Sequence, residues 1–384
     1  SYRILMDTCE LIKSASELVP NLKSRAQLTE DLRQIPKETV RDLLASGIYG
    51  IGIPRSYGGQ SVNYGVSLDV GMELAKGCGS SAWCYSLWTA HAYLIGHWPL
   101  EAQEEVFADA EYALCSSSLN PGRSEIKAVD GGYQLSGRWE FSSGCDSAKW
   151  VMLGAPGFQD RTWMLLPSQD YEIVDNWFVS GLKGTGSKDI LVKEAFVPVH
   201  RMLNVAQAGN ENRIGWETHG QTRYKIPIPA LLGWDLVAPI CGLAQGMIDE
   251  FVSMLKGTSG PGRTADSYAV HHRLSEAQAQ VDAGYILMKH DIEEMFRMAR
   301  EDREFRPLDR ARYRRDKAFV AQLCLRSVNS IFELSGAHAL FSSTNFQRIH
   351  RDAQAMARRD GLIMDLGGQQ YGRVALGLEP DGPI

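Results

Sequence analysis

Two serines that follow an aromatic strand carry the most specific chemistry in this chain. Residues 132–139 alternate in character as a strand does, and the turn Phe-Ser-Ser-Gly at 141–144 ends it. The hydroxyls of Ser142 and Ser143 and the backbone N–H groups of this turn lie close to Trp139 in the sequence. Such a surface suits a flat ring system that stacks on one side and is hydrogen-bonded at its rim, and a flavin is the obvious candidate.

A second glycine-rich bend supports this interpretation. It runs from Gly181 to Ser187 with the sequence Gly-Leu-Lys-Gly-Thr-Gly-Ser, and a strand pattern follows it up to Pro198. Five of the nine tryptophans fall between positions 83 and 150, which indicates either an aromatic core or an aromatic-lined pocket. The two bends together predict a β-rich domain that grips a cofactor.

Composition and charge exclude several other classes of function. The chain has 384 residues, 44% hydrophobic content and a formal net charge of −6, so it offers no overall attraction for nucleic acid or an anionic membrane. No run of about 18 apolar residues is present, and Asp7 stands too early for a signal peptide, so we expect a cytoplasmic enzyme. The seven cysteines show no metal-ligand spacing, and we expect no metal.

The periodicity changes twice along the chain and predicts an α+β fold. Residues 1–112 have helical spacing, 113–205 have strand alternation broken by turns, and 206–384 are helical again. We expect an N-terminal helical domain, a central domain of short strands (a small barrel or sandwich, of which we favour the barrel), and a C-terminal four-helix bundle. Its long helices are predicted at 236–256, 266–300, 308–337 and 346–360. No Gly-x-Gly-x-x-Gly follows a strand, so a dinucleotide site is not expected.

Six motifs in this order resemble those of the acyl-CoA dehydrogenase fold. Within that fold the chain looks like the oxygenase components of two-component flavin-dependent monooxygenases. The motifs are Ile53-Pro54 with Tyr57-Gly-Gly59, Gly79-Ser-Ser-Ala-Trp83, Trp139 to Gly144, Gly184-Thr-Gly-Ser187, Glu333-Leu-Ser-Gly-Ala337, and Gln347-Arg348 with Arg351-Asp352. The resemblance runs from Pro36 to Asp360, which is nearly the whole chain.

The resemblance implies a set of cofactor contacts. Ser143 matches the hydroxyl residue that hydrogen-bonds N5 of the flavin, with Ser142 beside it, and Trp139 would pack near the ring. Ser117, in Cys115-Ser-Ser-Ser118, matches a loop that lines flavin and substrate. Gly336 matches a turn that meets flavin across a subunit interface, which implies a homo-oligomer, usually a tetramer.

The resemblance also implies a reaction with reduced flavin (FADH2 or FMNH2) and O2. Many dehydrogenases of this fold carry a glutamate base in the loop before the last long helix. Here that loop is Leu340-Phe-Ser-Ser-Thr-Asn-Phe346, without a carboxylate. Monooxygenases instead form a hydroperoxide at flavin C4a, which lasts when N5 is hydrogen-bonded and water is excluded. Since no NAD(P)H motif is found, we expect a separate NAD(P)H:flavin reductase as partner.

Candidate catalytic groups for the substrate follow from the same comparison. His91 stands where relatives carry a pocket histidine, and we expect His91 and Trp88, one turn before it, to contact the substrate. Several aromatic hydroxylases place a histidine eight positions after the arginine that matches Arg351, whereas this chain has Arg359 there, followed by Asp360. Arg359 stays protonated and cannot be a base. It could orient an anionic or carbonyl substrate, pair with Asp360 or face solvent.

These substitutions leave the base and the substrate open. Asp360 could act as base, and His350 is a weaker candidate. We expect hydroxylation or epoxidation of a small electron-rich aromatic or heteroaromatic compound, indole-like or phenolic. An FAD-dependent acyl-CoA dehydrogenase and an amine N-oxygenase are the alternatives.

Overall fold

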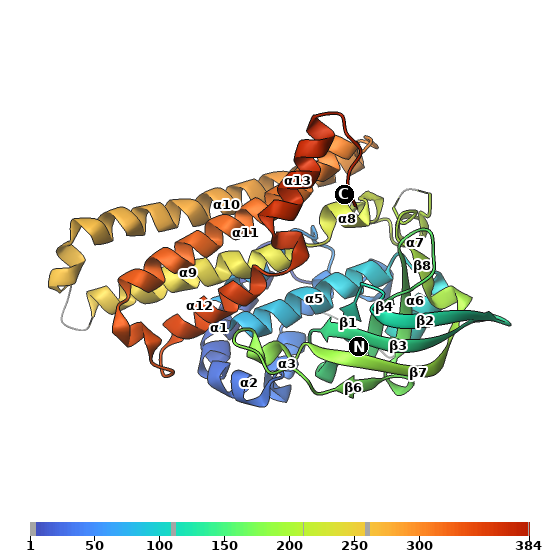
Figure 1. Cartoon of the computed structure of the whole chain (residues 1–384), viewed down its shortest axis with the longest axis horizontal. Coiled ribbons are helices and arrows are strands. Elements are labelled where there is room, and N and C mark those ends of the chain that lie inside the picture. The colour runs from blue at the N-terminus through green and yellow to red at the C-terminus, as the bar shows by residue number, and fades with distance from the viewer. Residues whose placement is uncertain (1–4, 109–112, 210, 258–261, 383) are drawn as a thin grey trace.

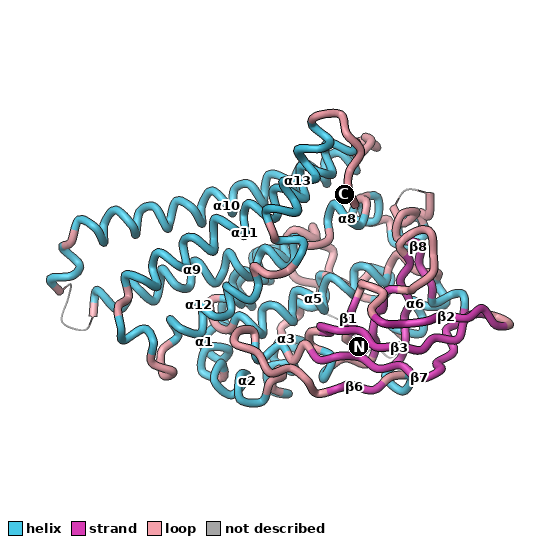
Figure 2. Tube along the Cα trace, in the orientation of Figure 1, coloured by secondary structure: helices cyan, strands magenta, loops and turns pink. Residues whose placement is uncertain are grey.

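The protein is a mixed helical and strand structure in which all the strands gather at one end. The computed structural model describes residues 5–108, 113–209, 211–257, 262–382 and 384. Helices form the other end and extend across the molecule, and Figures 1 and 2 show this division. The α+β prediction is therefore confirmed.

The N-terminal helices form where helical spacing predicts them. Leu11, Ala15 and Leu22 are buried on one face of the first helix, and Asp7 begins it with a capping box to Glu10. The helices before the strands are α1 (Thr8–Ser24), α2 (Ala26–Leu32), α3 (Lys37–Ala45), α4 (Val66–Ala75), α5 (Gly79–Ile95) and α6 (Leu100–Phe107). Nearly every residue of α5 is buried, so this helix runs through the core.

Short and long helices also follow the strands. They are α7 (Ile214–His219), α8 (Ile228–Leu231), α9 (Trp234–Lys256), α10 (Tyr268–Arg300), α11 (Pro307–Leu334), α12 (Asn345–Met356) and α13 (Met364–Ala375). The four predicted helices correspond to α9 to α12, whereas α13 was not predicted. Figure 1 shows α9, α10 and α11 lying side by side. Their arrangement as a four-helix bundle stays a prediction.

The strands form two four-stranded sheets, so the prediction of a closed barrel is wrong. They are β1 (Cys115–Ser118), β2 (Arg123–Val129), β3 (Gly132–Ser142), β4 (Trp150–Gly154), β5 (Thr162–Pro167), β6 (Glu172–Val174), β7 (Lys188–Pro198) and β8 (Met202–Asn204). One sheet has the order β1-β4-β5-β8 and the other β2-β3-β7-β6. Among the described residues no strand pairing joins them. The β1–β4 pair is parallel, and the β2–β3 hairpin supplies the crossover that a parallel pair needs.

Both faces of the first sheet are buried, which explains the unbroken apolar sequence of β4 and β5. Val151, Leu153 and Met164 face a small core shared with β3 and β7, whereas Met152 and Leu165 face the main core. That main core continues through the N-terminal and C-terminal helices. Because helices and strands share it, the domain limits at 112/113 and 205/206 stay a prediction.

One helical segment could cross a membrane by length and composition alone. It is Ile228–Lys256, and 83% of its most apolar window is buried inside the protein. A core helix of a globular protein has these same properties.

Candidate active site

The turn after β3 presents Ser143 through an irregular backbone. The pairing of β3 with β7 shifts register between Trp139 and Ser142, so an extra residue bulges there. Phe141 (φ 63°) and Gly144 (φ 71°) adopt left-handed conformations in this segment. A Cβ at Gly144 would lie 2.6 Å from Nε1 of Trp88, so both the conformation and the space require glycine.

Trp88 lies beneath this turn. Its side chain is 2% exposed, and its Nε1 donates to the carbonyl oxygen of Gly144 at 3.3 Å. We predicted a substrate contact for Trp88. The structure instead gives it the role of supporting the turn that carries Ser143, because its polar atom is already used by the backbone.

Ser143 begins a chain of three buried hydroxyls. Its Oγ lies 2.6 Å from Oγ of Ser187, which lies 2.7 Å from Oγ1 of Thr185, and that atom donates to the carbonyl oxygen of Leu182 at 2.8 Å. Ser143 and Ser187 are 7% and 5% exposed, and Thr185 is fully buried. The second glycine-rich bend therefore meets the first, as the sequence predicted. The roles of Ser187 and Thr185 were missed, although both lie in the Gly-Thr-Gly-Ser motif.

The bend at 181–187 is held by α12. Oδ1 of Asp352 accepts from the N–H of Leu182 at 2.7 Å, and Asp352 is 2% exposed. Burial raises the pKa of Asp352 to about 7, while the Leu182 hydrogen bond lowers it. Next to Asp352, Arg351 pairs with Glu30 at 2.7 Å and so ties α12 to α2.

Trp139 and Ser142 point into the protein. Trp139 is fully buried in the core between the two sheets, where its Nε1 donates to the carbonyl oxygen of Gly154 at 3.0 Å. Ser142 is also fully buried, and its Oγ donates to Oγ of Ser116 at 3.1 Å. The predicted flavin contacts of Trp139 and Ser142 are corrected accordingly, because Trp139 lies on the core face before the bulge and the bulge turns Ser142 to the same face.

The bulge exposes a different aromatic residue. Phe141 is 59% exposed and meets Trp177 edge to face, with ring centroids 6.0 Å apart. Trp177 is half-buried, and its Nε1 donates to the carbonyl oxygen of Leu182 at 3.0 Å. Phe178 beside it is 73% exposed. This aromatic surface adjoins the bend that meets Ser143, and the sequence analysis missed it because a period of two places Phe141 on the same face as Trp139.

His91 is a neutral histidine with one nitrogen fixed. It is 1% exposed, and Nδ1 lies 2.6 Å from the carbonyl oxygen of Cys115. A carbonyl oxygen can only accept, so Nδ1 carries the proton and Nε2 keeps a lone pair. Burial lowers the pKa of His91 to about 4; the Cys115 carbonyl raises it and the charge of Arg359 lowers it further. Since Cys115 precedes Ser116, the partner of Ser142, His91 lies in the same region as the turn.

Arg359 and Asp360 stand between α12 and α13. The Arg359 side chain reaches solvent, yet burial lowers the pKa of its guanidinium and Asp360 raises it, which is typical of a cation in a concave surface. Asp360 is exposed; burial lowers the pKa of Arg314, and the charge of Asp360 opposes that shift. The role of Asp360 as a base stays a prediction. The electrostatic effect of Arg359 on His91 brings these two predicted residues together.

The remaining predicted residues lie in different parts of the chain. Ser117 is half-buried on β1, opposite Met152, and its role stays a prediction. Gly336 (φ 70°) is exposed in the turn between α11 and α12, and this turn lies at the end of the molecule away from the sheets (Figure 1). The contact of Gly336 with flavin across a subunit interface stays a prediction. His350 stacks on Phe332 with centroids 4.2 Å apart, which is a packing role.

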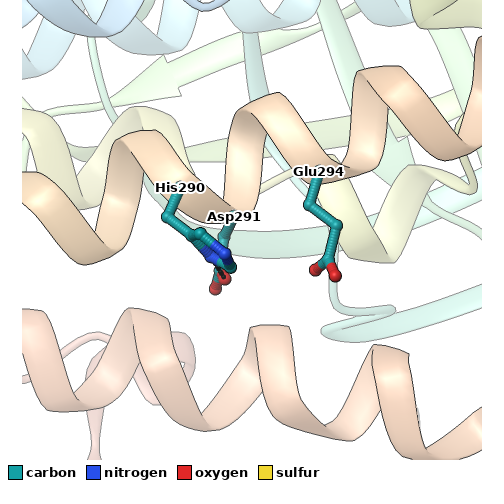
Figure 3. A group of neighbouring side chains, drawn as sticks. All are labelled: His290, Asp291 and Glu294. Carbon is teal, nitrogen blue, oxygen red and sulfur yellow. Dashed lines mark hydrogen bonds and ion pairs between the residues drawn. The ribbon is translucent and has the colours of Figure 1, made fainter.

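One cluster has metal-ligand residues but holds a protein cation. His290, Asp291 and Glu294 project from α10 toward a neighbouring helix (Figure 3), and their ligand atoms lie within 4.8 Å of one another. Arg312 on α11 donates to Oδ1 of Asp291 at 2.8 Å and pairs with Glu294. Its guanidinium supplies the positive charge, so we assign no metal to this cluster.

Two family models match the chain. The model described as acyl-CoA dehydrogenase, N-terminal domain, matches residues 10–109, and the model described as acyl-CoA dehydrogenase, C-terminal domain, matches residues 235–361. They cover the helices before the strands and, after the strands, α9 to α12.

Proteins similar to this chain include two oxygenase components. The oxygenase subunit HsaA of a flavin-dependent monooxygenase from Mycobacterium tuberculosis is 32% identical over 358 residues, covering 91% of each chain. The oxygenase component of an FADH2-dependent resorcinol hydroxylase from Rhizobium sp. is 32% identical over 378 residues, covering 94% of this chain and 92% of that one. The crystal structure of the HsaA monooxygenase from M. tuberculosis superposes with a TM-score of 0.93 at 32% identity, covering 98% of this chain and 99% of that chain.

Proposed function

The chain belongs to the acyl-CoA dehydrogenase family and is a flavin-dependent monooxygenase within it, and from this premise we propose that it hydroxylates a phenolic compound. The observation that carries the proposal is the neutral His91, whose Nδ1 proton is fixed on the carbonyl oxygen of Cys115. Its Nε2 is left to accept from a substrate O–H. The name of the Rhizobium relative, a resorcinol hydroxylase, also supports a phenol.

The residues present fit a flavin. Ser143 offers a hydroxyl at the end of the buried hydrogen-bonded chain, and Phe141 and Trp177 offer an aromatic surface next to the same bend. A flat ring with polar atoms along its rim needs both kinds of surface. We therefore propose Ser143 as the partner of flavin N5 and the Phe141–Trp177 surface as the part that keeps water out.

Each polar side chain has a distinct task in the proposed reaction. Reduced flavin, when bound, supplies the electron pair with which one atom of O2 enters the substrate while the other leaves as water. Ser143 holds the ring by its N5 edge. His91 accepts the hydrogen bond of the phenol through Nε2, which makes the phenol oxygen richer in electrons and the ring a stronger nucleophile. Arg359, which stays protonated, stabilises the negative charge that forms on the substrate oxygen.

Product analysis with oxygen-18 tests this function. The purified chain is combined with a separate NADH:flavin reductase, FAD or FMN, 18O2 and a panel of simple phenols, with indole for comparison. We expect one labelled oxygen atom in a phenolic product, and none when the reductase is omitted. Bleaching of bound oxidised FAD by an acyl-CoA without reductase would instead identify a dehydrogenase. Labelled product from indole alone would replace the phenol in the proposal with a heteroaromatic compound.

We propose in addition that the oxygenase works as a cytoplasmic homo-oligomer, most simply a tetramer, supplied by that reductase. Support comes from the exposed segment after α11, where Gly336 is followed by Leu340 and Phe341 at 68% and 60% exposure. Large apolar side chains side by side on a surface are typical of an interface. In such an assembly the Gly336 segment of one subunit would complete the flavin site of another.

A further inference from the structure

We infer that the hydroxyl chain Thr185–Ser187–Ser143 has a fixed direction, which makes Ser143 a hydrogen-bond acceptor and gives the site a preference for reduced over oxidised flavin. The inference rests on the proposed flavin site at Ser143. It adds the positioning residues Ser187 and Thr185, which select the redox form that binds.

The direction of the hydroxyl chain is decided at its inner end, which is Thr185. Oγ1 of Thr185 lies 2.8 Å from the carbonyl oxygen of Leu182, which has no proton, so Thr185 must be the donor of this bond. A hydroxyl has one proton, and Thr185 uses it on Leu182. If Thr185 instead donated its proton to Ser187, the lone pairs of Thr185 would face those of the Leu182 carbonyl oxygen at 2.8 Å.

The remaining protons follow in order. Since the proton of Thr185 is used, Oγ1 accepts from Ser187 at 2.7 Å. Ser187 has then used its own proton, so its Oγ accepts from Ser143 at 2.6 Å. The structure gives Ser187 and Thr185 no alternative side-chain partners among the described residues. Ser143 therefore has only lone pairs to offer to a ligand at the outer end of the hydroxyl chain.

Leu182, which accepts the proton at the inner end of the hydroxyl chain, is held by two further hydrogen bonds. Leu182 has a left-handed backbone (φ 53°), which aims its N–H and its carbonyl at different partners. The N–H donates to the buried carboxyl of Asp352 at 2.7 Å, and the carbonyl also accepts from Nε1 of Trp177 at 3.0 Å. With Leu182 fixed on both sides, its carbonyl oxygen stays in place to receive the proton of Thr185.

The two redox forms of flavin differ in the group that would meet Ser143. Reduced flavin carries N5–H, a donor that is complementary to the lone pairs of Ser143. Oxidised flavin has a bare N5, an acceptor, and would meet a second acceptor. A buried acceptor that meets another acceptor loses a hydrogen bond, so the oxidised form binds more weakly. Release of spent flavin and uptake of the reduced form would both follow from the direction of three hydroxyls.

The dissociation constants of both redox forms test the inference. They are measured anaerobically for reduced flavin and aerobically for oxidised flavin, with FAD and FMN as probes. The natural chain should bind the reduced form more tightly. Ser187→Ala removes the acceptor for the Ser143 proton, which can then turn to the bare N5. We expect the ratio of the oxidised to the reduced constant to fall by roughly fivefold to tenfold, mostly by tighter binding of the oxidised form.

The potential of the bound flavin gives a second readout. A tenfold change in the ratio corresponds to about 30 mV for a two-electron couple, and the potential should fall in Ser187→Ala because its preference for reduced flavin is weaker. Thr185→Ser keeps a hydroxyl at the inner end and is the matched control, so its ratio should equal that of the natural chain. In a Ser143→Ala background, Ser187→Ala should leave the ratio unchanged, which excludes a general distortion.

The outcomes separate this inference from the function it rests on. If the natural chain binds neither form of flavin, the proposed site itself is wrong. If it binds both forms but the ratio is the same in Ser187→Ala, the direction of the chain is irrelevant and the inference falls while the flavin site stands. An equal change in Thr185→Ser would also overturn it, because that variant preserves every hydroxyl. Circular dichroism confirms that each variant is folded before binding is measured.

Discussion

Ser143 and His91 reach the same chemical state by separate routes. In each case a backbone carbonyl fixes a proton, the carbonyl of Leu182 through two hydroxyls and that of Cys115 directly. Each side chain is then left with an acceptor atom at the site. Both are nearly buried, and at that depth an unpaired polar group is costly, so the proton has little freedom to move elsewhere.

Replacement of Ser143 tests the outer end of the hydroxyl chain. Ser143→Ala removes one hydrogen bond to N5 and should lower the product formed per reduced flavin consumed by roughly tenfold, equivalent to about 1.4 kcal/mol. The oxygen lost from product should appear as H2O2, which is measured with a peroxidase assay. Ser168→Ala, at an exposed serine of the same region, is the control. Equal coupling in both variants would remove Ser143 from the mechanism.

Replacement of His91 tests the substrate side. His91→Ala should lower phenol hydroxylation by about 10² or more, because the acceptor for the phenol proton is lost. Its melting temperature should change much less. His350→Ala, on the histidine that stacks on Phe332, should retain hydroxylation. A similar loss in both variants would contradict the role given to His91.

The pH profile provides an independent check of His91. Burial lowers its pKa to about 4, so the imidazole is neutral and able to accept a hydrogen bond at all pH values well above 4. Activity that depends on neutral His91 is therefore fully present from about pH 5.5 upward and is lost only as the pH falls through about 4. An acid limb near pH 6.5 that disappears in His91→Ala would show that His91 titrates as an exposed histidine does.

At the scale of elements, the site depends on contacts between segments far apart in the sequence. The bend at 181–187 meets the end of β3 through hydroxyls, and α12 holds that bend through Asp352. Trp88 on α5 supports the turn from below. Since α5 lies in the core and α12 is tied to α2 by the Glu30–Arg351 pair, the turn is positioned by rigid helices. Rigid supporting elements keep a catalytic group within a fraction of an ångström of its productive geometry.

Loss of the Asp352 side chain should weaken this support, because it holds the bend at 181–187 through the N–H of Leu182. Asp352→Ala leaves the N–H of Leu182 buried without its acceptor and should lower the free energy of unfolding by about 1–3 kcal/mol. It should also weaken binding of both flavin forms. Asp352→Asn keeps an oxygen acceptor and, because the pKa of Asp352 is raised to about 7, resembles its protonated state. Urea denaturation distinguishes the variants, and equal stability of Ala and Asn would show that this bond is unimportant.

At the scale of the whole molecule, the strand end and the helical end have different tasks. The sheets carry Ser143 and the aromatic surface, whereas the turn between α11 and α12 lies at the other end (Figure 1). The turn that contains Gly336 and the strand end of the same chain therefore lie apart in the molecule. The proposed oligomer resolves this arrangement, because the exposed Leu340 and Phe341 beside Gly336 would be covered by a second subunit.

A charge on that exposed segment should separate the subunits. Phe341→Glu puts a carboxylate into the proposed interface, and light scattering should show a smaller species than for the natural chain. Flavin binding should weaken together with assembly. Phe196→Glu, at a residue that is 50% exposed on β7, is the control and should leave the mass unchanged. A natural chain that is monomeric at micromolar concentration would contradict the proposed oligomer.

The sequence alone was enough to predict the order of the elements and to propose Ser143 as a residue of the site. Helix and strand periods are local properties, so the helix–strand–helix order and the helices α9 to α12 could be predicted from spacing. The turn chemistry around Gly144 likewise indicated Ser142 and Ser143, and the family resemblance favoured Ser143. These features depend on residues that are neighbours along the chain.

The tertiary structure decided which side chains face the site and which atoms carry protons. One bulge in the β3–β7 pairing exposes Phe141 and buries Ser142, and two sheets form where we expected a barrel. The direction of the Ser143 hydrogen bond depends on Ser187, Thr185 and the Leu182 carbonyl, some 40 residues further along the chain. A hydroxyl can donate or accept, and only the groups that folding packs against it determine which it does.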